Sequence, residues 1–395
     1  IKNAATTAGV RVIPSRMSIL TEKLNDERGV CQFCGQCGRN CSYYKADFSS
    51  PNVLIYPAMK TGNIDIIANS MAREVLTDKE GKATGVSYID KTEMQEYQVS
   101  GRVVIVAASA CESARLLLNS KSQRHANGLA NDSDVVGRYL HDSTGAAVGG
   151  FIPQLFGRKR YNEDGVGGMH VYSPWWLDNK KLDFPRGYHI EYWGGMGQPA
   201  YGFQWGIENM NGKYVVSGKK KEAGGYGASL KEDYRHFYGA SVGMAGRGEA
   251  ISFAHNRCTI DPEVVDRFGI PVLKFDVKWS EHEIKQARHM KETFKEIMHN
   301  MGAVITWGGD DNETNNWGLT KPGEIIHEAG TIRMGNNPKT SALNKWSQAH
   351  DCKNLFNVDG GQFVSQADKN ITWTILALSM RTSEYIIEQL KQQNL

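Results

Sequence analysis

The sequence predicts a two-domain α/β (α+β) protein in which an antiparallel β-sheet domain interrupts an α/β domain. Three observations support this prediction. An apolar, β-branched run at 102–108 leads directly into a helical stretch at 111–118, which is typical of a strand buried in a parallel sheet. Glycine and aromatic segments then dominate residues 146–320, as in an antiparallel sheet. After residue 325 the α/β pattern returns and ends in an apolar-striped helix at 372–390.

Local patterns place two further elements. Residues 64–77 and 83–89 alternate in the manner of strands and flank a polar turn, which predicts a β-hairpin. Ser280 and Glu283 have the spacing of a capping box, which predicts that a helix begins there and ends at Gly302. Its apolar residues recur at helical spacing: Ile284, Ala287, Phe294, Ile297 and Met301.

Composition excludes several classes of protein. The 395 residues are enough for two or three cores, and 40% hydrophobic with 23% charged residues is typical of a globular chain. The formal net charge is +3 without a long basic run, so nucleic-acid binding has no electrostatic support. No stretch approaches the roughly 20 apolar residues of a membrane-spanning helix. We therefore expect partners other than nucleic acid and no membrane-spanning segment.

Four cysteines within eleven residues are the most specific local motif. Their spacing is C-x2-C-x2-C-x3-C, the run that wraps an iron–sulfur cluster, with Ser42 following instead of the proline of ferredoxins. Zinc fits less well because it usually takes two separated C-x2-C pairs, and two disulfides in so short a run would be strained. The cluster would be [3Fe-4S] or [4Fe-4S], and its predicted ligands are Cys31, Cys34, Cys37 and Cys41.

Three ordered motifs near the C-terminus carry a second signal. Residues 327–335 read HEAGTIRMG, residues 354–360 read NLFNVDG, and residues 370–374 read NITWT. Together they resemble the C-terminal signature of the glucose–methanol–choline family of flavin oxidoreductases. Residues 63–86 resemble that family's hairpin beside the adenine, and residues 103–118 resemble its strand-and-helix segment. The resemblance covers most of the chain and implies FAD as cofactor.

The resemblance assigns roles that the chemistry of alcohol oxidation supports. Loss of a hydride from carbon requires a base for the hydroxyl proton, and a histidine of near-neutral pKa suits that task. His327 corresponds to the family's catalytic histidine, and Asn370 to the partner that steers the same oxygen. The remaining assignments are to FAD: Val75 at the adenine, Asp359 and Gly360 at the pyrophosphate and ribityl chain, and Thr372 in the third motif.

A cysteine-rich segment before the adenine hairpin is similar to that of a subgroup of bacterial sugar dehydrogenases. Residues 108–115, 127–131 and 137–139 look most like glucoside 3-dehydrogenases, which oxidise the C3 hydroxyl of glucosides and disaccharides. This implies a glycoside substrate and electron transfer through the cluster to a c-type cytochrome or a quinone. Aromatic residues that could stack on pyranose faces, or simply pack in a sheet, are Trp175, Trp176, Tyr192, Trp193 and Trp205.

Two alternatives stay open at this point. One is a related dehydrogenase acting on the anomeric carbon of glucose, on gluconate or on a polyol. The other is a non-catalytic iron–sulfur electron-transfer or binding subunit, which would follow from the absent FAD fingerprint. The G-x-G-x-x-G motif is missing, because the glycine clusters at 165–168 and 224–227 lie in the β-rich part without a strand-to-helix context. The chain thus looks like the C-terminal two-thirds of an enzyme.

The predicted organisation therefore has four segments. They are a cysteine-rich iron–sulfur segment at 1–60, a middle part of a Rossmann-like FAD domain at 61–145, a β-rich substrate domain at 146–320, and the C-terminal FAD part with the catalytic pair at 321–395. Relatives pair with a small accessory subunit that carries the export signal. The lack of a signal segment here agrees with periplasmic co-export through such a partner, and also with a cytoplasmic enzyme.

Overall fold

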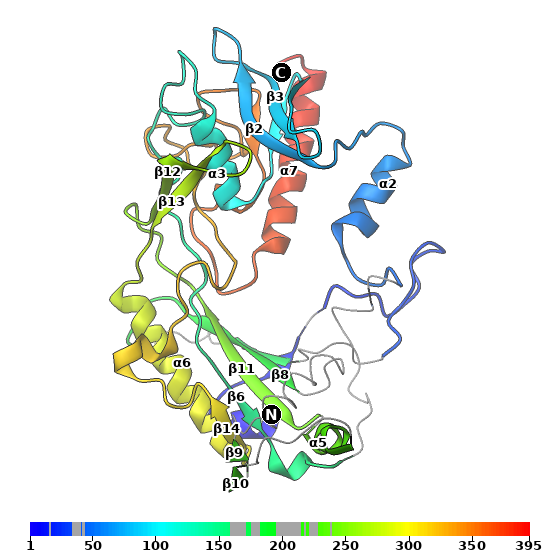
Figure 1. The fold of residues 1–395 in the computed structure, drawn as a ribbon, viewed down its shortest axis with the longest axis vertical. Helices are drawn as coiled ribbons and strands as arrows, with labels where there is room; N and C mark the ends of the chain where they lie inside the picture. Colours follow the sequence, from blue (N-terminus) through cyan, green and yellow to red (C-terminus); the bar gives the residue numbers. More distant parts are fainter. Residues whose placement is uncertain are drawn as a thin grey trace. The chain divides into compact units, whose positions relative to one another are not determined.

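The computed structural model divides the chain into two compact units, which are described separately (Figure 1). Unit 1 comprises Ile1–Ile66, Gly145–Arg247 and Ile284–Leu319, and unit 2 comprises Ile67–Thr144, Gly248–Glu283 and Thr320–Leu395. The structure describes residues 1–15, 17–33, 41, 44–158, 171–174, 182–194, 215–216, 219–220, 228–237 and 239–395.

Unit 1 is built on a six-stranded sheet. The pairs β1–β7, β7–β8, β11–β6 and β6–β14 are antiparallel, as the Gly/aromatic pattern predicts. The strand order is β1 (Ile13–Pro14), β7 (Val171–Pro174), β8 (Tyr188–Gly194), β11 (Ser241–Gly248), β6 (Ala147–Phe151) and β14 (Val304–Trp307). Smaller elements are α1 (Lys2–Thr7), α2 (Tyr56–Met59), α5 (Ala228–Phe237), and the pair β9 (Val215–Val216) and β10 (Lys219–Lys220).

Helix α6 (Glu281–Asn300) packs its apolar stripe on this sheet. Its start follows the predicted capping box, since the Glu283 carboxylate accepts the Ser280 backbone N–H at 2.7 Å. The predicted core residues Ala287, Phe294 and Ile297 are fully buried. They pack in one cluster with strand residues that include Val148, Ile190, Tyr192, Val242 and Met244. Helical periodicity therefore identified the buried face correctly.

Unit 2 is an α/β unit with three small sheets. Strands β5 and β15 pair in parallel, and the chain passes from β5 into α3, as the sequence predicts. Val104 and Val106 are buried but Ile105 between them is exposed, so the expectation of a fully buried strand is wrong for one of its faces. The elements are β2 (Ser70–Thr77), β3 (Ala83–Asp90) and β4 (Glu96–Ser100) in one sheet, β5 (Val104–Val106) with β15 (Leu355–Asn357), β12 (Arg257–Val265) with β13 (Pro271–Asp276), α3 (Ala110–Asn119) and α7 (Thr372–Lys391).

Asn354 connects these small sheets. Its side-chain carbonyl accepts the Ala83 N–H at 3.0 Å, and its amide donates to the carbonyls of Ala83 at 2.7 Å and Arg102 at 2.8 Å. One buried amide, carried by the segment before β15, thus satisfies backbone groups of the hairpin and of the segment before β5. Because unpaired buried backbone groups are costly, this side chain fixes the relative position of the three segments.

The division into units differs from the predicted domains in one segment. Residues 248–283 lie in unit 2, although the sequence places them in the β-rich domain at 146–320. The cause is Arg115 on α3, whose guanidinium pairs with Asp266 at 2.7 Å and donates to the carbonyl of Pro271 at 2.8 Å. This buried arginine holds the β12–β13 hairpin against α3.

The predicted aromatic residues divide into two groups. Trp175, Trp176 and Trp205 lie outside the described residues. Tyr192 is buried in the core of unit 1, where its hydroxyl is 2.8 Å from Ser173 Oγ, so it packs in the sheet and does not present a face to a sugar. Trp193 stacks on Trp307 with ring centroids 6.4 Å apart.

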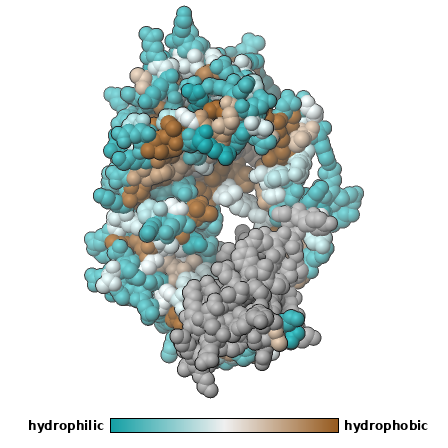
Figure 2. Space-filling view, in the orientation of Figure 1, coloured by the Kyte–Doolittle hydropathy of each residue, from teal (hydrophilic) through white to brown (hydrophobic). Residues whose placement is uncertain are grey.

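Helix α7 carries apolar side chains on more than one side. Ile386 is buried, whereas Trp373, Met380 and Ile387, spaced seven residues apart, are exposed. Figure 2 shows brown apolar patches among teal hydrophilic residues on the visible face. None of the described helices combines the length and the hydropathy that crossing a membrane requires.

We predict that Asn354→Ala lowers the free energy of unfolding by about 3 kcal/mol, because it leaves three backbone groups unpaired in the core. Urea unfolding followed by circular dichroism measures the loss. Asn394→Ala, at the exposed end of the chain, is the matched control and should change stability by less than about 0.5 kcal/mol. Equal stabilities of the two variants would contradict the proposed role of Asn354.

Candidate active site

His327 and Asn370, predicted as a catalytic pair, are neighbours in unit 2. The Asn370 side-chain nitrogen is 3.2 Å from His327 Nε2. Asn370 is exposed and His327 is half-buried, so both remain accessible from outside. The two residues are 43 positions apart in the chain, and the fold alone brings them together.

The other ring nitrogen of His327 contacts a polar chain that the sequence did not indicate. His327 Nδ1 is 3.2 Å from Ser143 Oγ, and Ser143 Oγ accepts a hydrogen bond from Gln366 Nε2 at 2.6 Å. With the Asn370 amide nitrogen facing Nε2, the proton of a neutral ring lies on Nδ1 and is donated to Ser143. Nε2 then holds the lone pair that general-base catalysis requires.

Asp142 anchors the segment that carries His327. Its carboxylate accepts backbone N–H groups of Ser143 at 2.7 Å, His327 at 2.9 Å and Gly323 at 3.2 Å. Burial raises the pKa of Asp142, and these N–H groups act in the opposite direction because they favour the charged form. Burial also raises the pKa of neighbouring Glu328, and the nearby Asp142 charge adds to the shift. Both carboxyls line a cavity of about 440 Å³.

Gly330 explains why a glycine follows His327 by three residues. Its φ is +97°, and a Cβ atom there would lie 2.4 Å from the carbonyl oxygen of Tyr139. This close approach allows His141 and Ala329 to exchange backbone hydrogen bonds at 3.1 and 2.9 Å. The segment 327–334 therefore needs a residue without a side chain at this position.

The first two C-terminal motifs lie side by side. Backbone N–H groups of Gly330, Ile332 and Met334 donate to the carbonyls of Gly360, Gly361 and Gln362 at 3.1, 2.8 and 2.9 Å. This alternating ladder places Gly360 against the His327 segment. A Cβ at Gly360 would lie 2.9 Å from Glu328 O and 3.4 Å from the Ile371 side chain.

Asp359 follows β15 and is buried beside the first turn of α3. It accepts hydrogen bonds from Ser113 Oγ at 2.5 Å, Asn357 Nδ2 at 3.1 Å and the Gly361 N–H at 2.8 Å. Burial raises its pKa, although these bonds favour the charged form. Ser109, which precedes α3, has φ +80°, a conformation that favours glycine.

The last two predicted flavin residues occupy different environments. Val75 is buried in β2, and its backbone N–H donates to Ser120 Oγ at 2.8 Å. Thr372 is exposed in the first turn of α7, two residues after Asn370. The structure thus brings His327, Asn370, Gly360 and Thr372 into one region of unit 2, while Val75 lies in the hairpin sheet.

The cysteine run belongs to unit 1, and its two ends are described. Cys31 and Cys41 are buried, whereas Cys34 and Cys37 lie outside the described residues. Backbone hydrogen bonds connect the ends: Cys31 N–H donates to Leu20 O at 2.7 Å, Leu20 N–H to Ala46 O at 2.8 Å, and Ala46 N–H to Cys41 O at 2.9 Å. The run therefore starts and finishes on one hydrogen-bonded stem.

Sequence reasoning missed Asp142, Ser143 and Gln366. A signal existed for the first two, since they lie three and four residues after the segment 137–139, which already carried the resemblance. Gln366 had no signal, because its role depends on a contact with Ser143 across 223 residues.

Two family models named GMC oxidoreductase match this chain. The N-terminal model matches residues 3–144 and the C-terminal model matches residues 253–379, so together they span more than half of the sequence. Both matches include segments of the candidate site. The C-terminal match contains His327, Asp359 and Asn370.

Three curated relatives match most of this chain but are themselves considerably longer. A 2-methyl-1,2-propanediol dehydrogenase of Mycolicibacterium austroafricanum is 30% identical over 86% of this chain and 57% of its own length. The gluconate 2-dehydrogenase flavoprotein of Pantoea cypripedii is 27% identical over 93% of this chain and 58% of its own. The fructose dehydrogenase large subunit of Gluconobacter japonicus is 26% identical over 86% and 57%. The chain thus spans somewhat more than half of these relatives.

A solved structure supports the fold. The formate oxidase of Aspergillus oryzae RIB40 superposes with a TM-score of 0.59 at 14% identity, covering 88% of this chain and 67% of that chain. At this identity the likeness concerns the fold alone. It agrees with the mixed α/β architecture that the sequence predicts.

We predict that Asp142→Asn loosens the His327 segment. An amide offers one acceptor oxygen in place of two, so at least one backbone N–H loses its partner, at a cost of about 1–3 kcal/mol. Amide hydrogen exchange at Gly323 and His327 should accelerate by about tenfold to a hundredfold. The control Asp276→Asn, at an exposed position of β13, should leave the exchange of the Gly323 and His327 amides unchanged. Unchanged exchange of these amides in Asp142→Asn would show that the Asp142 carboxylate is dispensable.

Proposed function

Because this chain belongs to the GMC oxidoreductase family, we propose that it forms the substrate-oxidising part of an FAD- and iron–sulfur-dependent sugar dehydrogenase. The substrate is a glucoside or disaccharide, oxidised at a secondary hydroxyl, C3, to a keto sugar. The observation that carries the proposal is the His327–Asn370 pair, held at 3.2 Å in an accessible part of unit 2.

The residues of the pair divide the work on the hydroxyl group. His327 Nε2 takes the hydroxyl proton, and the Asn370 amide orients the same oxygen. Ser143 and Gln366 hold Nδ1, which keeps the ring in the tautomer with its lone pair on Nε2. Asp142 fixes the backbone of His327, so the ring does not swing away when a substrate binds.

FAD fits the residues around the pair. Helix α7 begins beside Asn370 without a capping side chain among the described residues, which leaves backbone N–H groups for a polar ring. Bound FAD supplies the hydride acceptor. Asp359 has a structural role near the cofactor, because its carboxylate already accepts hydrogen bonds from Ser113 and Gly361. An adenine contact through the Val75 N–H requires displacement of Ser120.

We assign the cysteine run to an iron–sulfur cluster that passes electrons to a cytochrome or quinone. The hydrogen-bonded stem supports this assignment, because it connects the segments of Cys31 and Cys41, the first and last cysteines of the run. Thiolate ligands also explain why buried cysteines stand in so polar a segment. Spectroscopy of the purified protein would distinguish a [3Fe-4S] from a [4Fe-4S] cluster.

A second substrate assignment is favoured by the curated relatives. Gluconate 2-dehydrogenase, fructose dehydrogenase and a propanediol dehydrogenase act on gluconate, fructose and a diol, according to their names. The C3 assignment follows the similarity of residues 108–115 and 127–131 to glucoside 3-dehydrogenases. Product analysis separates the two, because a 3-keto glucoside keeps its glycosidic bond, whereas gluconate, fructose and a diol contain no such bond.

The partners follow from the same proposal. Two relatives are named as a large subunit and as a flavoprotein, which supports an assembly with further subunits. We propose a small accessory subunit that carries the export signal, a c-type cytochrome or quinone as acceptor, and the periplasm as location.

We predict that His327→Ala slows flavin reduction by substrate by about a hundredfold to ten-thousandfold, since the general base is lost. Anaerobic stopped-flow absorbance of the full enzyme measures this rate. His299→Ala, at the exposed end of α6, should reduce flavin at the wild-type rate. Rapid flavin reduction by His327→Ala, or a purified protein without flavin absorbance, would contradict catalysis and favour an electron-transfer subunit.

We predict that Cys34→Ser separates the two half-reactions. Substrate should still reduce the flavin at the wild-type rate, while cytochrome reduction falls below about a tenth of it, because the cluster loses a ligand. Cys352→Ser, remote in sequence from the run, serves as the control and should retain cytochrome reduction. Unimpaired cytochrome reduction in Cys34→Ser would exclude the electron-relay role.

A further inference from the structure

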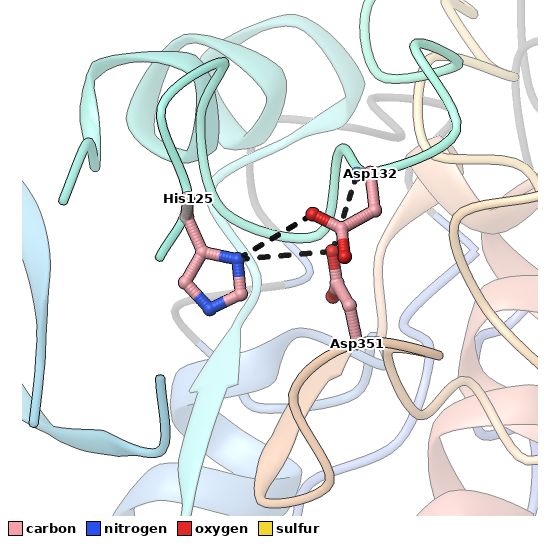
Figure 3. A group of neighbouring side chains, drawn as sticks. All are labelled: His125, Asp132 and Asp351. Carbon is pink, nitrogen blue, oxygen red and sulfur yellow. Dashed lines mark hydrogen bonds and ion pairs between the residues drawn. The ribbon is translucent and has the colours of Figure 1, made fainter. Parts of the chain in front are cut away.

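A cluster of one histidine and two aspartates lies in unit 2, apart from the residues around His327. His125 and Asp132 belong to the segment that follows α3, and Asp351 belongs to the segment before β15. Figure 3 shows the imidazole of His125 pointing toward the carboxylates of Asp132 and Asp351. One ligand atom of each residue lies within 4.8 Å of the other two.

The hydrogen bonds of His125 determine its tautomer. The ring is almost completely buried, and Nε2 is 3.2 Å from the carbonyl oxygen of Gly81, in the β2–β3 turn. A carbonyl oxygen only accepts, so Nε2 carries a proton and a neutral ring has its lone pair on Nδ1. Nδ1 lies 3.8 Å from Asp132 Oδ1 and 4.0 Å from Asp351 Oδ2. In the part of the chain that the structure describes, Nδ1 has no hydrogen-bond partner.

The negative charges around His125 outnumber the positive ones. Arg124 pairs with the outer oxygen of Asp132 at 3.1 Å, and Asp351 Oδ2 accepts the Asp132 N–H at 3.3 Å. Asp351 Oδ1 is buried and has no partner among the described residues. One guanidinium thus faces two carboxylates and a ring lone pair. Three electron-rich atoms that face one another repel unless a positive charge lies between them.

We propose that His125, Asp132 and Asp351 bind a Zn²⁺ ion. An imidazole nitrogen with carboxylate oxygens is a ligand set that zinc accepts, and bond lengths of about 2.0–2.2 Å allow two ligands on one ion to lie up to roughly 4 Å apart. The Nε2 bond to the Gly81 carbonyl is the outer contact that orients a metal-binding histidine. Asp132 is half-exposed, so water reaches the fourth coordination position.

The ion would act as a structural link. Its ligands and the Gly81 carbonyl belong to three segments: the β2–β3 turn, the segment after α3 and the segment before β15. Binding to the folded chain alone would stabilise unit 2 by mass action, with the effect set by the zinc concentration relative to its dissociation constant. A protonated His125 held by the two carboxylates is the competing arrangement, and it requires no metal.

The experiment compares the full chain with two variants after removal of metals by a chelator. Wild type, Asp132→Asn and the control Asp134→Asn are incubated with zinc, freed of excess ion and analysed for metal content. Asp134 is exposed two residues further along the same segment and pairs with Arg138, so its variant matches the charge change without touching the cluster. Zinc held by the cysteine run is common to all three proteins and cancels in the comparison.

We expect wild type and Asp134→Asn to hold one zinc per chain more than Asp132→Asn, whose affinity falls at least tenfold. Zinc should raise the melting temperature of the first two only. Asp132→Glu, which keeps a carboxylate, should regain metal, and it supplies the test should Asp132→Asn fail to fold by circular dichroism. Equal zinc content and equal thermal shifts in wild type and a folded Asp132→Asn would overturn the site.

Discussion

The candidate active site depends on backbone pairing between residues 330–334 and residues 360–362. His327 lies three residues before the paired segment 330–334, and Asn370 lies eight residues after the paired segment 360–362. The short connections limit where the two side chains can lie. Gly330 makes the arrangement possible, because its left-handed backbone and missing side chain let residues 139–141 approach from the other side.

Buried carboxylates serve two different purposes in unit 2. Asp142 and Asp359 accept several hydrogen bonds each, Asp142 from backbone N–H groups and Asp359 from two side chains and one backbone N–H, so their charge fixes the local chain path. Asp351 has a buried oxygen without a donor among the described residues and faces a histidine lone pair. The first arrangement satisfies the carboxylate from within the chain. The second one is where we propose that a cation binds.

The chemistry assigned to this chain is divided between its two units. The catalytic pair and its supporting residues Asp142, Ser143 and Gln366 belong to unit 2, whereas the cysteine run belongs to unit 1. Under the proposed function, oxidation of the substrate and delivery of electrons would therefore depend on different cores. Because the two sites belong to different units, a substitution in the cysteine run would test electron transfer without changing the hydrogen bonds that orient His327.

Local sequence patterns determined the strand before α3, the hairpin β2–β3, the helices α3, α6 and α7, and the motif residues His327, Gly330 and Asn370. These features depend on periodicity and on positions that admit one residue type. The burial of Tyr192, the attachment of the β12–β13 hairpin through Arg115, and the support of His327 by Ser143 and Gln366 were decided by tertiary structure. Each joins residues far apart in the chain, and no local pattern encodes which distant side chains will meet.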